Sequence, residues 1–380
     1  MKKIILIFIM IMLLLPKITV SAEISGDFEY ATKGDGIAIT KYIGKQDIIV
    51  IPDNLEGKPV MIIGDLGDCV FGENAVSITV PSSVTKIGSV AFSSCAELKS
   101  IIVDSNNLNF SSDEQNILYN KNKTRLLKCP RGKRGCVKIP NDVINIGDGA
   151  FYGCENIISI NIPDSVTDIE RYAFQDCVGL TSVTIPSSVI SLGDYAFGNC
   201  KNLSTIILNN PYTLIETFIH GRGSYPDFIP LYSTPFSGCQ NLTEIYGYPG
   251  STAEEFANEQ GYTFIPIIKV LLNGGELVFD APPHTVNDRV MLPMRKIFES
   301  LGAEVIWDED TQTVTAQKDG TVIIMQIDNP QMTVNGQPIP LDAAPCFMYD
   351  RTLVPVRAIS EALGMKINWN GDENTVEITK

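Results

Sequence analysis

Nine cysteines are the residues of this 380-residue chain with the clearest potential for metal or disulfide chemistry. Five of them share one position of a repeating pattern, namely Cys95, Cys154, Cys177, Cys200 and Cys239. In stacked parallel strands, equivalent side chains lie near the strand spacing of ~4.8 Å, beyond the ~3.8 Å Cβ separation that disulfides prefer. We therefore expect a column of buried, reduced thiols. A linear column also does not provide the tetrahedral arrangement of a metal site. Cys129 and Cys136, which flank a short loop, are the best candidate disulfide pair.

The sequence lacks the motifs that carry common enzymatic chemistry. It contains no G-x-S-x-G elbow, no H-E-x-x-H helix and no Walker loop. Asp308 and Asp310 fall in a predicted hairpin turn, where carboxylates are more often solvated than catalytic. The two histidines, His220 and His284, cannot supply a three-histidine copper site within one chain. We predict a non-enzymatic protein without a metal or cofactor.

The cysteine column belongs to a 23-residue repeat that is clearest between Ala150 and Leu203. The same spacing relates Phe151, Phe174 and Phe197, and also Pro140, Pro163 and Pro186. Within one turn, an L-x-x-V-x-I run predicts a short strand, and the following Pro186 ends it because proline cannot donate to the ladder. Gly193 then allows a tight bend. A period of about 20 to 50 residues predicts a solenoid, in which each turn buries its apolar face against its neighbours.

This repeat resembles the BspA-like (Treponema-type) leucine-rich repeat, whose unit has the form LxxLxLPxxLxxIGxxAFxxCxx. The resemblance implies a secreted or surface-exposed binding solenoid. We expect the solenoid to span residues 23–266, with an N-terminal cap over residues 23–80 and a C-terminal cap that begins with a helix near Thr252. The period breaks twice, between Phe92 and Phe151 and between Phe197 and Phe236, which predicts two inserts.

The outward positions of the repeat strands form the candidate contact surface, because alternate residues of a strand point to opposite faces. The strongest candidates are Ser159, Asn161, Thr181, Ser182, Thr184, Ser204, Thr205 and Tyr246. Lys99, Ser100, Ile102, Ile158, Ile207, Thr243 and Glu244 occupy equivalent positions. This mostly small and uncharged face suits an extended polar partner such as a glycan or a protein strand. The alternative is that these residues only keep the sheet soluble.

Each of the two inserts also contains candidate binding residues. The first ends in a basic loop, Lys128–Lys138, where Arg131, Lys133 and Arg134 are possible anion contacts and the alternative is a solvated loop tip. The second insert is rich in aromatic residues and histidine: Tyr212, Phe218, His220, Tyr225, Phe228 and Tyr232. Those side chains either bind a partner or pack back onto the solenoid.

Residues 267–380 contain a different repeat, in which residues 289–318 align with residues 351–380. The matching pairs, all 62 residues apart, are Pro293 and Pro355, Arg295 and Arg357, Gly302 and Gly364, and Trp307 and Trp369. Each half predicts a strand, a helix and a hairpin, with the glycine just past the helix end. We expect the tryptophans to anchor a strand onto its helix. The arginines either bond carbonyls at the strand–helix junction or contact an anion.

This segment resembles the copper amine oxidase N-terminal-like domain, also called a stalk domain. In the oxidases, this domain lies apart from the copper site, so the resemblance implies a fold and no chemistry. The predicted fold class is therefore mainly β with α+β character: a leucine-rich repeat solenoid followed by a small duplicated α+β domain.

The N-terminus predicts export. Residues 1–22 combine Lys2 and Lys3 with a 12-residue apolar run and the small residues Val20-Ser21-Ala22, as in a cleavable signal peptide. The apolar run is too short for a membrane span of ~20 residues, and we expect no span in the mature chain. The net charge of −15 argues against nucleic acid as a partner.

Together, these features predict a non-catalytic secreted or cell-surface binding protein. Its solenoid face would contact a protein or glycan, and its stalk domain would act as a spacer or contact a cell-wall polymer. Two alternatives remain open: a purely structural component of the cell envelope and, more distantly, a hydrolase or an amine oxidase-related enzyme.

Overall fold

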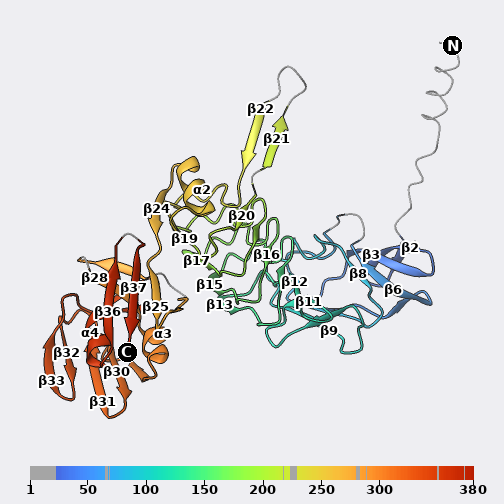
Figure 1. The fold of residues 1–380 in the computed structure, drawn as a ribbon. Helices are drawn as coiled ribbons and strands as arrows, with labels where there is room; N and C mark the ends of the chain where they lie inside the picture. The colour runs from blue at the N-terminus through green and yellow to red at the C-terminus, as the bar shows by residue number, and fades with distance from the viewer. Residues whose placement is uncertain are drawn as a thin grey trace. The chain divides into compact units, whose positions relative to one another are not determined.

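The computed structural model of the chain describes residues 23–64, 67, 69–216, 218–222, 229–279, 283–287, 289–348, 351–371 and 373–380. The predicted signal peptide lies outside these residues, as do Tyr225 and Phe228. The chain forms two compact units (Figure 1). The N-terminal unit runs to Lys123 and includes Pro130–Gly132, and the second unit contains Thr124–Cys129 and Lys133–Lys380.

The N-terminal unit begins as a cap and continues as a solenoid. Its strands are β1 (Glu23–Ser25), β2 (Phe28–Lys33), β3 (Gly36–Tyr42), β4 (Ile48–Val50), β5 (Asn54–Leu55), β6 (Lys58–Ile63), β7 (Ser77–Val80), β8 (Lys86–Ile87), β9 (Ser100–Val103), β10 (Phe110–Ser112) and β11 (Leu118–Asn120). The cap pairs β1, β2 and β3 antiparallel, and the turn between β2 and β3 lies at Gly34 and Asp35. From there on β3, β6 and β8 pair in parallel, as do β4, β7 and β9. The antiparallel hairpin of β10 and β11 lies in the first predicted insert.

The second unit continues the solenoid as two sets of parallel strands. One ladder contains β12 (Arg125–Lys128), β14 (Asn145–Ile146), β16 (Asp168–Ile169), β18 (Ser191–Leu192) and β20 (Leu214–Ile215). The other set pairs β13 (Gly135–Lys138) with β15 (Ile157–Asn161), and then orders β17 (Ser182–Ile185), β19 (Thr205–Leu208), β23 (Glu244–Gly247) and β24 (Thr263–Pro266). Ile146, Ile169 and Leu192 pair in sequence, so residues 23 apart lie side by side. The predicted solenoid is therefore confirmed.

Stacked phenylalanine rings form the interior of the solenoid. The ring centroids of Phe151 and Phe174 are 4.8 Å apart, and those of Phe174 and Phe197 are 4.9 Å apart. Phe236 continues the stack at 5.9 Å from Phe197. Phe256 then closes it at 5.7 Å with a tilted ring. All five rings are almost fully buried, which removes the apolar face of every turn from water.

The C-terminal cap supplies the last ring of that stack. Phe256 lies on helix α2 (Thr252–Gln260), which is the predicted capping helix. Its N-cap is Ser251, one residue before the predicted Thr252, and the Ser251 side chain accepts a hydrogen bond from the Glu254 backbone N–H. Gly261 ends the helix with a φ of 77°. The solenoid is thus closed by a helix whose apolar face replaces the missing next turn.

The cysteine column is buried and reduced, as predicted. Three of its thiols donate a hydrogen bond to the phenylalanine carbonyl of the preceding turn: Cys177 to Phe151 at 3.2 Å, Cys200 to Phe174 at 3.1 Å and Cys239 to Phe197 at 3.0 Å. Burial raises the pKa of the Cys177 thiol well above its ordinary value. This repeat position therefore needs a small buried group that also donates a hydrogen bond.

The candidate disulfide between Cys129 and Cys136 is not formed. Cys129 is buried and belongs to the thiol column, where Cys154 Sγ lies 3.8 Å from its carbonyl oxygen. Cys136 lies on β13 and is exposed, and both thiols are free. The sequence did not reveal this because the first insert displaces Cys129 from the 23-residue spacing.

The second insert forms a hairpin that extends away from the rest of the solenoid (Figure 1). Its strands, β21 (Phe218–Arg222) and β22 (Ile229–Ser233), pair antiparallel. The chain re-enters the solenoid at Thr234 and Pro235, whose carbonyls accept hydrogen bonds from the N–H groups of Tyr195 and Phe197. The hairpin is therefore inserted within one turn, and the ladder continues on either side of it.

The C-terminal domain is a separate α+β domain. Its elements are β25 (Lys269–Leu272), β26 (Gly275–Glu276), β27 (His284–Val286), β28 (Arg289–Pro293), α3 (Met294–Ser300), β29 (Glu304–Asp308), β30 (Thr313–Lys318), β31 (Thr321–Gln326), β32 (Gln331–Val334), β33 (Gln337–Pro340), β34 (Cys346–Met348), β35 (Arg351–Pro355), α4 (Val356–Ala362), β36 (Lys366–Asn370) and β37 (Thr375–Thr379). They form three sheets, ordered β27-β28-β35-β34, β29-β30-β31-β32-β33 and β26-β25-β37-β36. Both halves of the duplication contain the predicted strand, helix and hairpin.

The two halves of this domain are related by a local two-fold axis. Strands β28 and β35 pair antiparallel, with Leu292 opposite Val354, its own equivalent 62 residues later. Met291 lies opposite Pro355, and Pro293 lies opposite Leu353, so the pairs on either side of the axis exchange equivalent positions. Helix α3 contacts β35, and α4 contacts β28. Each helix is thus held by the other half as well as by its own.

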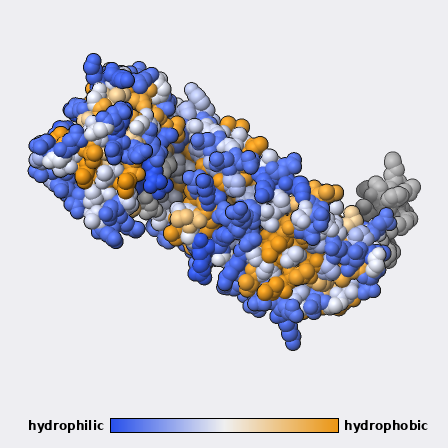
Figure 2. Space-filling view, turned by 90° about the horizontal axis from the view of Figure 1, so that it is seen from below, coloured by the Kyte–Doolittle hydropathy of each residue, from blue (hydrophilic) through white to orange (hydrophobic). Residues whose placement is uncertain are grey.

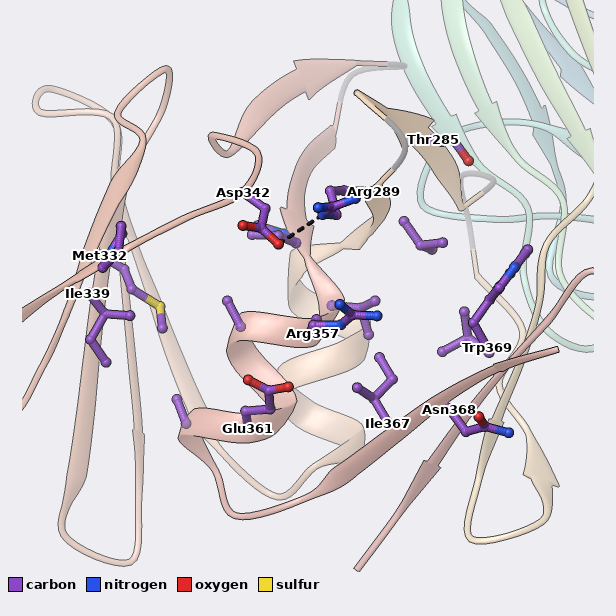
Figure 3. Close-up of a pocket in the computed structure, with 17 residues that line it drawn as sticks. Thr285, Arg289, Met332, Ile339, Asp342, Arg357, Glu361, Ile367, Asn368 and Trp369 are labelled. Atoms are coloured by element: carbon purple, nitrogen blue, oxygen red, sulfur yellow. Dashed lines mark hydrogen bonds and ion pairs between the residues drawn. The ribbon is translucent and has the colours of Figure 1, made fainter. Parts of the chain in front are cut away.

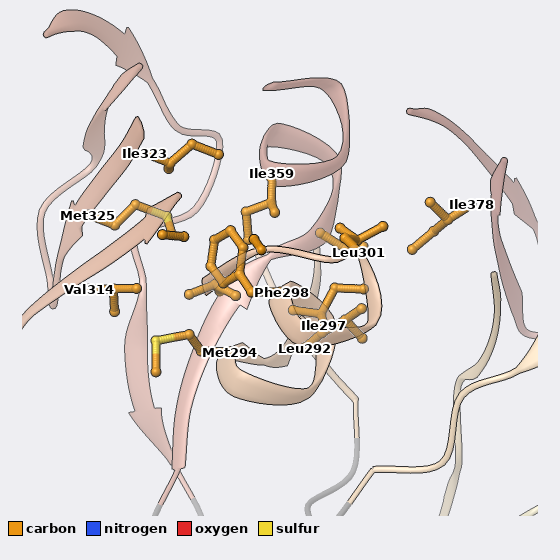
Figure 4. Close-up of a cluster of buried hydrophobic side chains, with 14 of the residues drawn as sticks. Leu292, Met294, Ile297, Phe298, Leu301, Val314, Ile323, Met325, Ile359 and Ile378 are labelled. Carbon is orange, nitrogen blue, oxygen red and sulfur yellow. The ribbon is translucent and has the colours of Figure 1, made fainter. Parts of the chain in front are cut away.

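The domain core lies between these helices and the sheets (Figure 4). Phe298, Ile297 and Ile359 are fully buried in it. Trp307 packs against this core, which confirms its predicted anchoring role. The same prediction is wrong for Trp369, which is 44% exposed and lines a cavity. The duplication therefore places equivalent tryptophans in different surroundings.

Candidate binding surfaces

A strip of uncharged polar side chains follows the outward positions of neighbouring solenoid turns. We call it the hydroxyl strip, and it consists of Ser159, Asn161, Thr181, Ser182, Thr184 and Ser204. Asn161, Thr181 and Ser204 are exposed, and the other three are half-buried. The Ser204 N–H donates to the Thr181 carbonyl at 2.9 Å, so these two exposed residues occupy adjacent turns. The outward orientation predicted from the repeat is confirmed for this part of the face.

The prediction that the outward positions are accessible is wrong for Thr205, Ile207 and Tyr246, which are buried. They are 4%, 3% and 2% exposed. Ile207 pairs with Tyr246, and Tyr246 pairs with Ile265 in the ladder. Ile207, Tyr246 and Ile267 form a buried apolar cluster, with Tyr248 and Ile265 packed against it. The outward column thus changes from polar at Thr184 to apolar at Ile207, and the segment after β24 covers it.

Apolar side chains also occupy outward positions in the N-terminal unit. Ile48, Val50 and Ile102 are 60%, 64% and 43% exposed, and they lie on the ladder of β4, β7 and β9. The face shown in Figure 2 carries apolar side chains in patches between polar ones. Single exposed apolar residues are common on protein surfaces and do not by themselves define a site.

The basic loop divides into structural and exposed residues. The Lys128 side chain is buried, and its ammonium donates to the Gly149 carbonyl at 2.8 Å. The Arg131 guanidinium donates to the Ser93 carbonyl at 3.0 Å. Arg134 is exposed, and Lys133 is half-buried. Lys128 and Arg131 therefore have a structural role, and the anion contact remains a prediction for Lys133 and Arg134.

The aromatic insert is described only in part. Tyr212 is 82% exposed, so it does not pack back onto the solenoid. Phe218, His220 and Tyr232 lie on the β21–β22 hairpin. Tyr225 and Phe228 lie outside the described residues.

A cavity of about 670 Å³ in the C-terminal domain was not predicted from the sequence (Figure 3). Residues of β27, β28, β32, β33, α4 and β36 line it. Arg289 Nε lies 2.8 Å from Asp342 Oδ2 in its wall. Figure 3 shows Arg357, Ile367 and Trp369 around one part of the cavity. The only sign of this cavity in the sequence was the equivalence of Arg357 with Arg295. That equivalence did not indicate which of the two arginines borders a cavity.

Neither duplicated arginine has the predicted structural role. Arg295 and Arg357 are both exposed at the starts of their helices. Within the described residues, neither guanidinium donates to a backbone carbonyl or pairs with a carboxylate. The predicted carbonyl bonding at the strand–helix junction is therefore wrong for these residues. Arg357 lines the cavity.

The described residues offer no cluster of side chains for metal ligation. Within them, no three His, Cys, Asp or Glu side chains lie close enough together to hold a metal ion. His284 lies on β27, where burial lowers the pKa of its imidazole and Glu244 opposes that shift. In the same part of the chain, no helix is long and apolar enough to cross a membrane.

Two regions of the chain match known protein families. Residues 62–132 and 135–221 match the BspA type leucine rich repeat region in six copies. Residues 271–378 match the copper amine oxidase N-terminal domain. The repeats are thus of the BspA type, and the C-terminal domain is a copper amine oxidase N-terminal domain. Such repeats are typical of surface or secreted proteins, and this domain is not the catalytic part of the oxidases.

Similar solved structures are bacterial leucine-rich repeat proteins. One from Eubacterium ventriosum is 19% identical with a TM-score of 0.40, over 67% of this chain and 87% of that one. A leucine rich cell surface protein from Faecalibacterium prausnitzii is 18% identical with a TM-score of 0.31, over 62% and 97%. A leucine rich repeat protein from T. pallidum is 22% identical with a TM-score of 0.29, over 64% and 98%. No curated protein matches the chain.

Proposed function

We propose that this chain is an exported, non-catalytic binding protein that contacts a protein or glycan through the hydroxyl strip. The observation that carries the proposal is the strip itself: uncharged donors and acceptors at the outward positions of successive turns, of which β17 and β19 are paired in register. An extended polar partner can meet such a column with one contact per turn, at a spacing of ~4.8 Å. The C-terminal domain would act as a spacer or contact a cell-wall polymer.

The introduction of positive charge into the hydroxyl strip tests this proposal. Protein and glycan arrays first identify a partner that binds the full chain saturably. The variant Thr181→Lys, Ser182→Lys, Thr184→Lys is then expected to weaken binding at least tenfold, because three cations occupy the centre of the strip. The matched control, Ile144→Lys, Thr167→Lys, Ile190→Lys, adds the same charge to exposed and half-buried positions beside the other ladder. This control is expected to bind normally.

Three results would contradict the proposal. Equal weakening by both triple variants would show a general charge effect. Absence of any saturable partner would favour a purely structural role in the cell envelope, and amine-dependent release of peroxide would favour an oxidase-related enzyme.

Export is supported by the basic and apolar composition of residues 1–22. Cell fractionation is expected to find the protein in the medium or at the cell surface. N-terminal sequencing of the mature protein is expected to begin at Glu23. A cytoplasmic protein that retains Met1 would contradict this part of the proposal.

A further inference from the structure

The cavity of the C-terminal domain has the size of a site for a small ligand. Its volume of about 670 Å³ lies within the range of roughly 300–1,000 Å³ that is common for ligand pockets. It lies outside the hydroxyl strip and shares no residue with it. Three segments distant in sequence converge on it, residues 285–290, 332–342 and 355–376. The chain therefore has a second concave surface that the proposed function does not use.

One cation in this cavity makes no ion pair within the described residues. Arg289 is paired with Asp342 at 2.8 Å. Arg357 lines the same cavity, is exposed, and has no ion pair or hydrogen bond within the described residues. A guanidinium presents parallel N–H donors that match the two oxygens of a carboxylate. Arg357 is therefore available for an anionic group of a ligand.

Aliphatic side chains form most of the remaining wall. Val290, Ile339, Val356 and Ile367 are among the lining residues, and Trp369 leaves 44% of its surface exposed. Covering this surface with apolar ligand atoms is favourable by about 25 cal/mol per Å² of area buried. A sugar, whose hydroxyls need many hydrogen-bonding partners, fits aliphatic walls poorly. An apolar amino-acid side chain fits them well.

The backbone beside the cavity is also open to a peptide. Among the residues that the structure describes, strand β36, which contributes Ile367, Asn368 and Trp369, is an edge strand of the sheet β26-β25-β37-β36. One side of an edge strand has unpaired N–H and C=O groups, to which an extended peptide can add. The side-chain amide of Asn368 supplies a further donor and acceptor at the same edge.

We propose that this cavity binds a short peptide with apolar side chains and a free carboxylate. Arg357 holds the carboxylate, the aliphatic wall and Trp369 cover the side chains, and β36 pairs with the peptide backbone. Glu361, one helical turn after Arg357, also lines the cavity and favours a ligand that carries a positive group, such as an amine, away from its carboxylate. This inference goes beyond the proposed function, because it does not depend on the hydroxyl strip.

The duplication provides a matched control for each residue. Arg295 and Glu299 repeat the spacing of Arg357 and Glu361 on the other helix, and Trp307 repeats Trp369. Of these three, none lines the cavity. A change at Arg295 alters the charge of the protein as much as the same change at Arg357. It therefore separates binding in the cavity from a general charge effect.

Fluorescence of Trp369 tests the proposal in the full chain. The variant Trp307→Phe leaves Trp369 as the only tryptophan, because the chain has two. Its emission is measured during titration with a pool of tripeptides that have leucine or valine side chains and a free carboxylate, and with the same pool as C-terminal amides. We expect a saturable change with the carboxylate pool, and at least tenfold weaker binding of the amides. Trp369→Phe, which retains the packed Trp307, is expected to show little change in emission.

The arginine variants complete the test. Arg357→Gln is expected to weaken binding of the carboxylate pool at least tenfold, and Arg295→Gln is expected to leave it unchanged. Calorimetric titration of the protein without tryptophan substitutions checks that Trp307→Phe has not created or removed the site. Equal binding of amides and carboxylates, equal effects of the two arginine variants, or no saturable binding would overturn the proposal. Preferential binding of an oligoglucuronide would also overturn it, in favour of an acidic glycan.

Discussion

The solenoid and the C-terminal domain both contain repeats, but their copies are related in different ways. In the solenoid, a residue lies beside its equivalent in the next turn, as Ile169 lies beside Leu192. In the C-terminal domain, the copies face each other, as Leu292 faces Val354 across antiparallel strands. Repetition along an axis therefore gives each copy nearly the same neighbours. A two-fold relation inside a larger domain does not.

This difference determines what kind of surface each region offers. The solenoid repeats one turn, so its candidate site is a flat column of similar side chains, from Ser159 to Ser204. In the C-terminal domain, Trp307 is packed against the core, and its equivalent Trp369 lines a cavity. The two copies have the same residues in different surroundings, so a concave site can form in one without the other.

Removal of a central ring from each core tests whether the two regions are separate units of stability. Phe174→Ala removes one ring from the solenoid stack, and Phe298→Ala removes the buried ring of the C-terminal core. Each is expected to lower the free energy of unfolding of its own region by about 3–5 kcal/mol. Both tryptophans lie in the C-terminal domain, so their fluorescence reports its unfolding, whereas circular dichroism reports both regions.

Phe174→Ala should therefore shift the circular dichroism transition in urea and leave the tryptophan transition unchanged. Phe298→Ala should shift the tryptophan transition. A common shift of both signals in either variant would show that the two regions unfold as one cooperative unit. The two regions would then differ in the arrangement of their repeats but not in their stability.

High pH should lower the free energy of unfolding of the solenoid more than that of the C-terminal domain. Burial raises the pKa of the thiols of Cys129 and Cys177 in the folded protein. Thiols of the unfolded chain begin to lose protons near pH ~8.5, whereas the folded protein keeps them. A raised folded pKa contributes stability below the unfolded pKa, and this contribution is lost as the pH rises further. The free energy of unfolding should thus fall above pH ~8.5, by about 1.4 kcal/mol per pH unit for each thiol.

The variant Cys129→Ala, Cys177→Ala isolates this effect from other groups that titrate at high pH. Urea unfolding of both proteins between pH 8 and 10 is expected to show a shallower decline for the variant. Parallel curves would mean that the column opens to solvent without global unfolding.

Two positions, one in each region, require glycine for different structural reasons. At Gly193 an added Cβ would lie 2.6 Å from the Arg171 backbone nitrogen of the preceding turn, so the position requires glycine because adjacent turns approach closely. At Gly336 there is open space, but the φ of +79° disfavours other residues. We expect Gly193→Ala to cost about 1–3 kcal/mol of unfolding free energy and Gly336→Ala to cost about 1 kcal/mol.

Asparagine separates the two causes, because it tolerates positive φ and is larger than alanine. Gly336→Asn should therefore be less destabilising than Gly336→Ala, and Gly193→Asn should be more destabilising than Gly193→Ala. The measurement is thermal or urea unfolding of the four variants. The same rank order at both positions would show that close approach and backbone conformation are not the separate causes proposed here.

Most of the fold could be predicted from the sequence because it depends on local spacing. Residues 23 apart in sequence become neighbours in the solenoid, so the phenylalanine and cysteine columns follow from the repeat alone. The strand, helix and hairpin of each C-terminal half follow from apolar spacing and from Gly302 and Gly364 past the helix ends. The failures occurred where spacing no longer applies, as at Cys129 after the first insert.

The candidate sites were less predictable because exposure depends on contacts distant in sequence. The repeat assigns Tyr246 and Thr184 the same outward direction, but Ile267 packs against Tyr246, which is buried, whereas Thr184 is half-buried. Likewise, nothing in the duplicated motif distinguishes Arg357 from Arg295. Part of the wall of the cavity beside Arg357 comes from β27, β32 and β33, which lie outside the aligned segments 289–318 and 351–380.

The smallest expected effect is on stability when either duplicated arginine is changed. Both side chains are exposed and have no hydrogen bond within the described residues, so Arg295→Gln and Arg357→Gln should each change the free energy of unfolding by less than about 0.5 kcal/mol. Urea unfolding followed by tryptophan fluorescence measures both. A loss above about 1 kcal/mol for Arg357→Gln alone would assign that arginine to the framework of the domain. Equal, near-zero effects would mean that the folded state does not need either guanidinium, so that any weakening of peptide binding by Arg357→Gln reports a direct contact with the ligand.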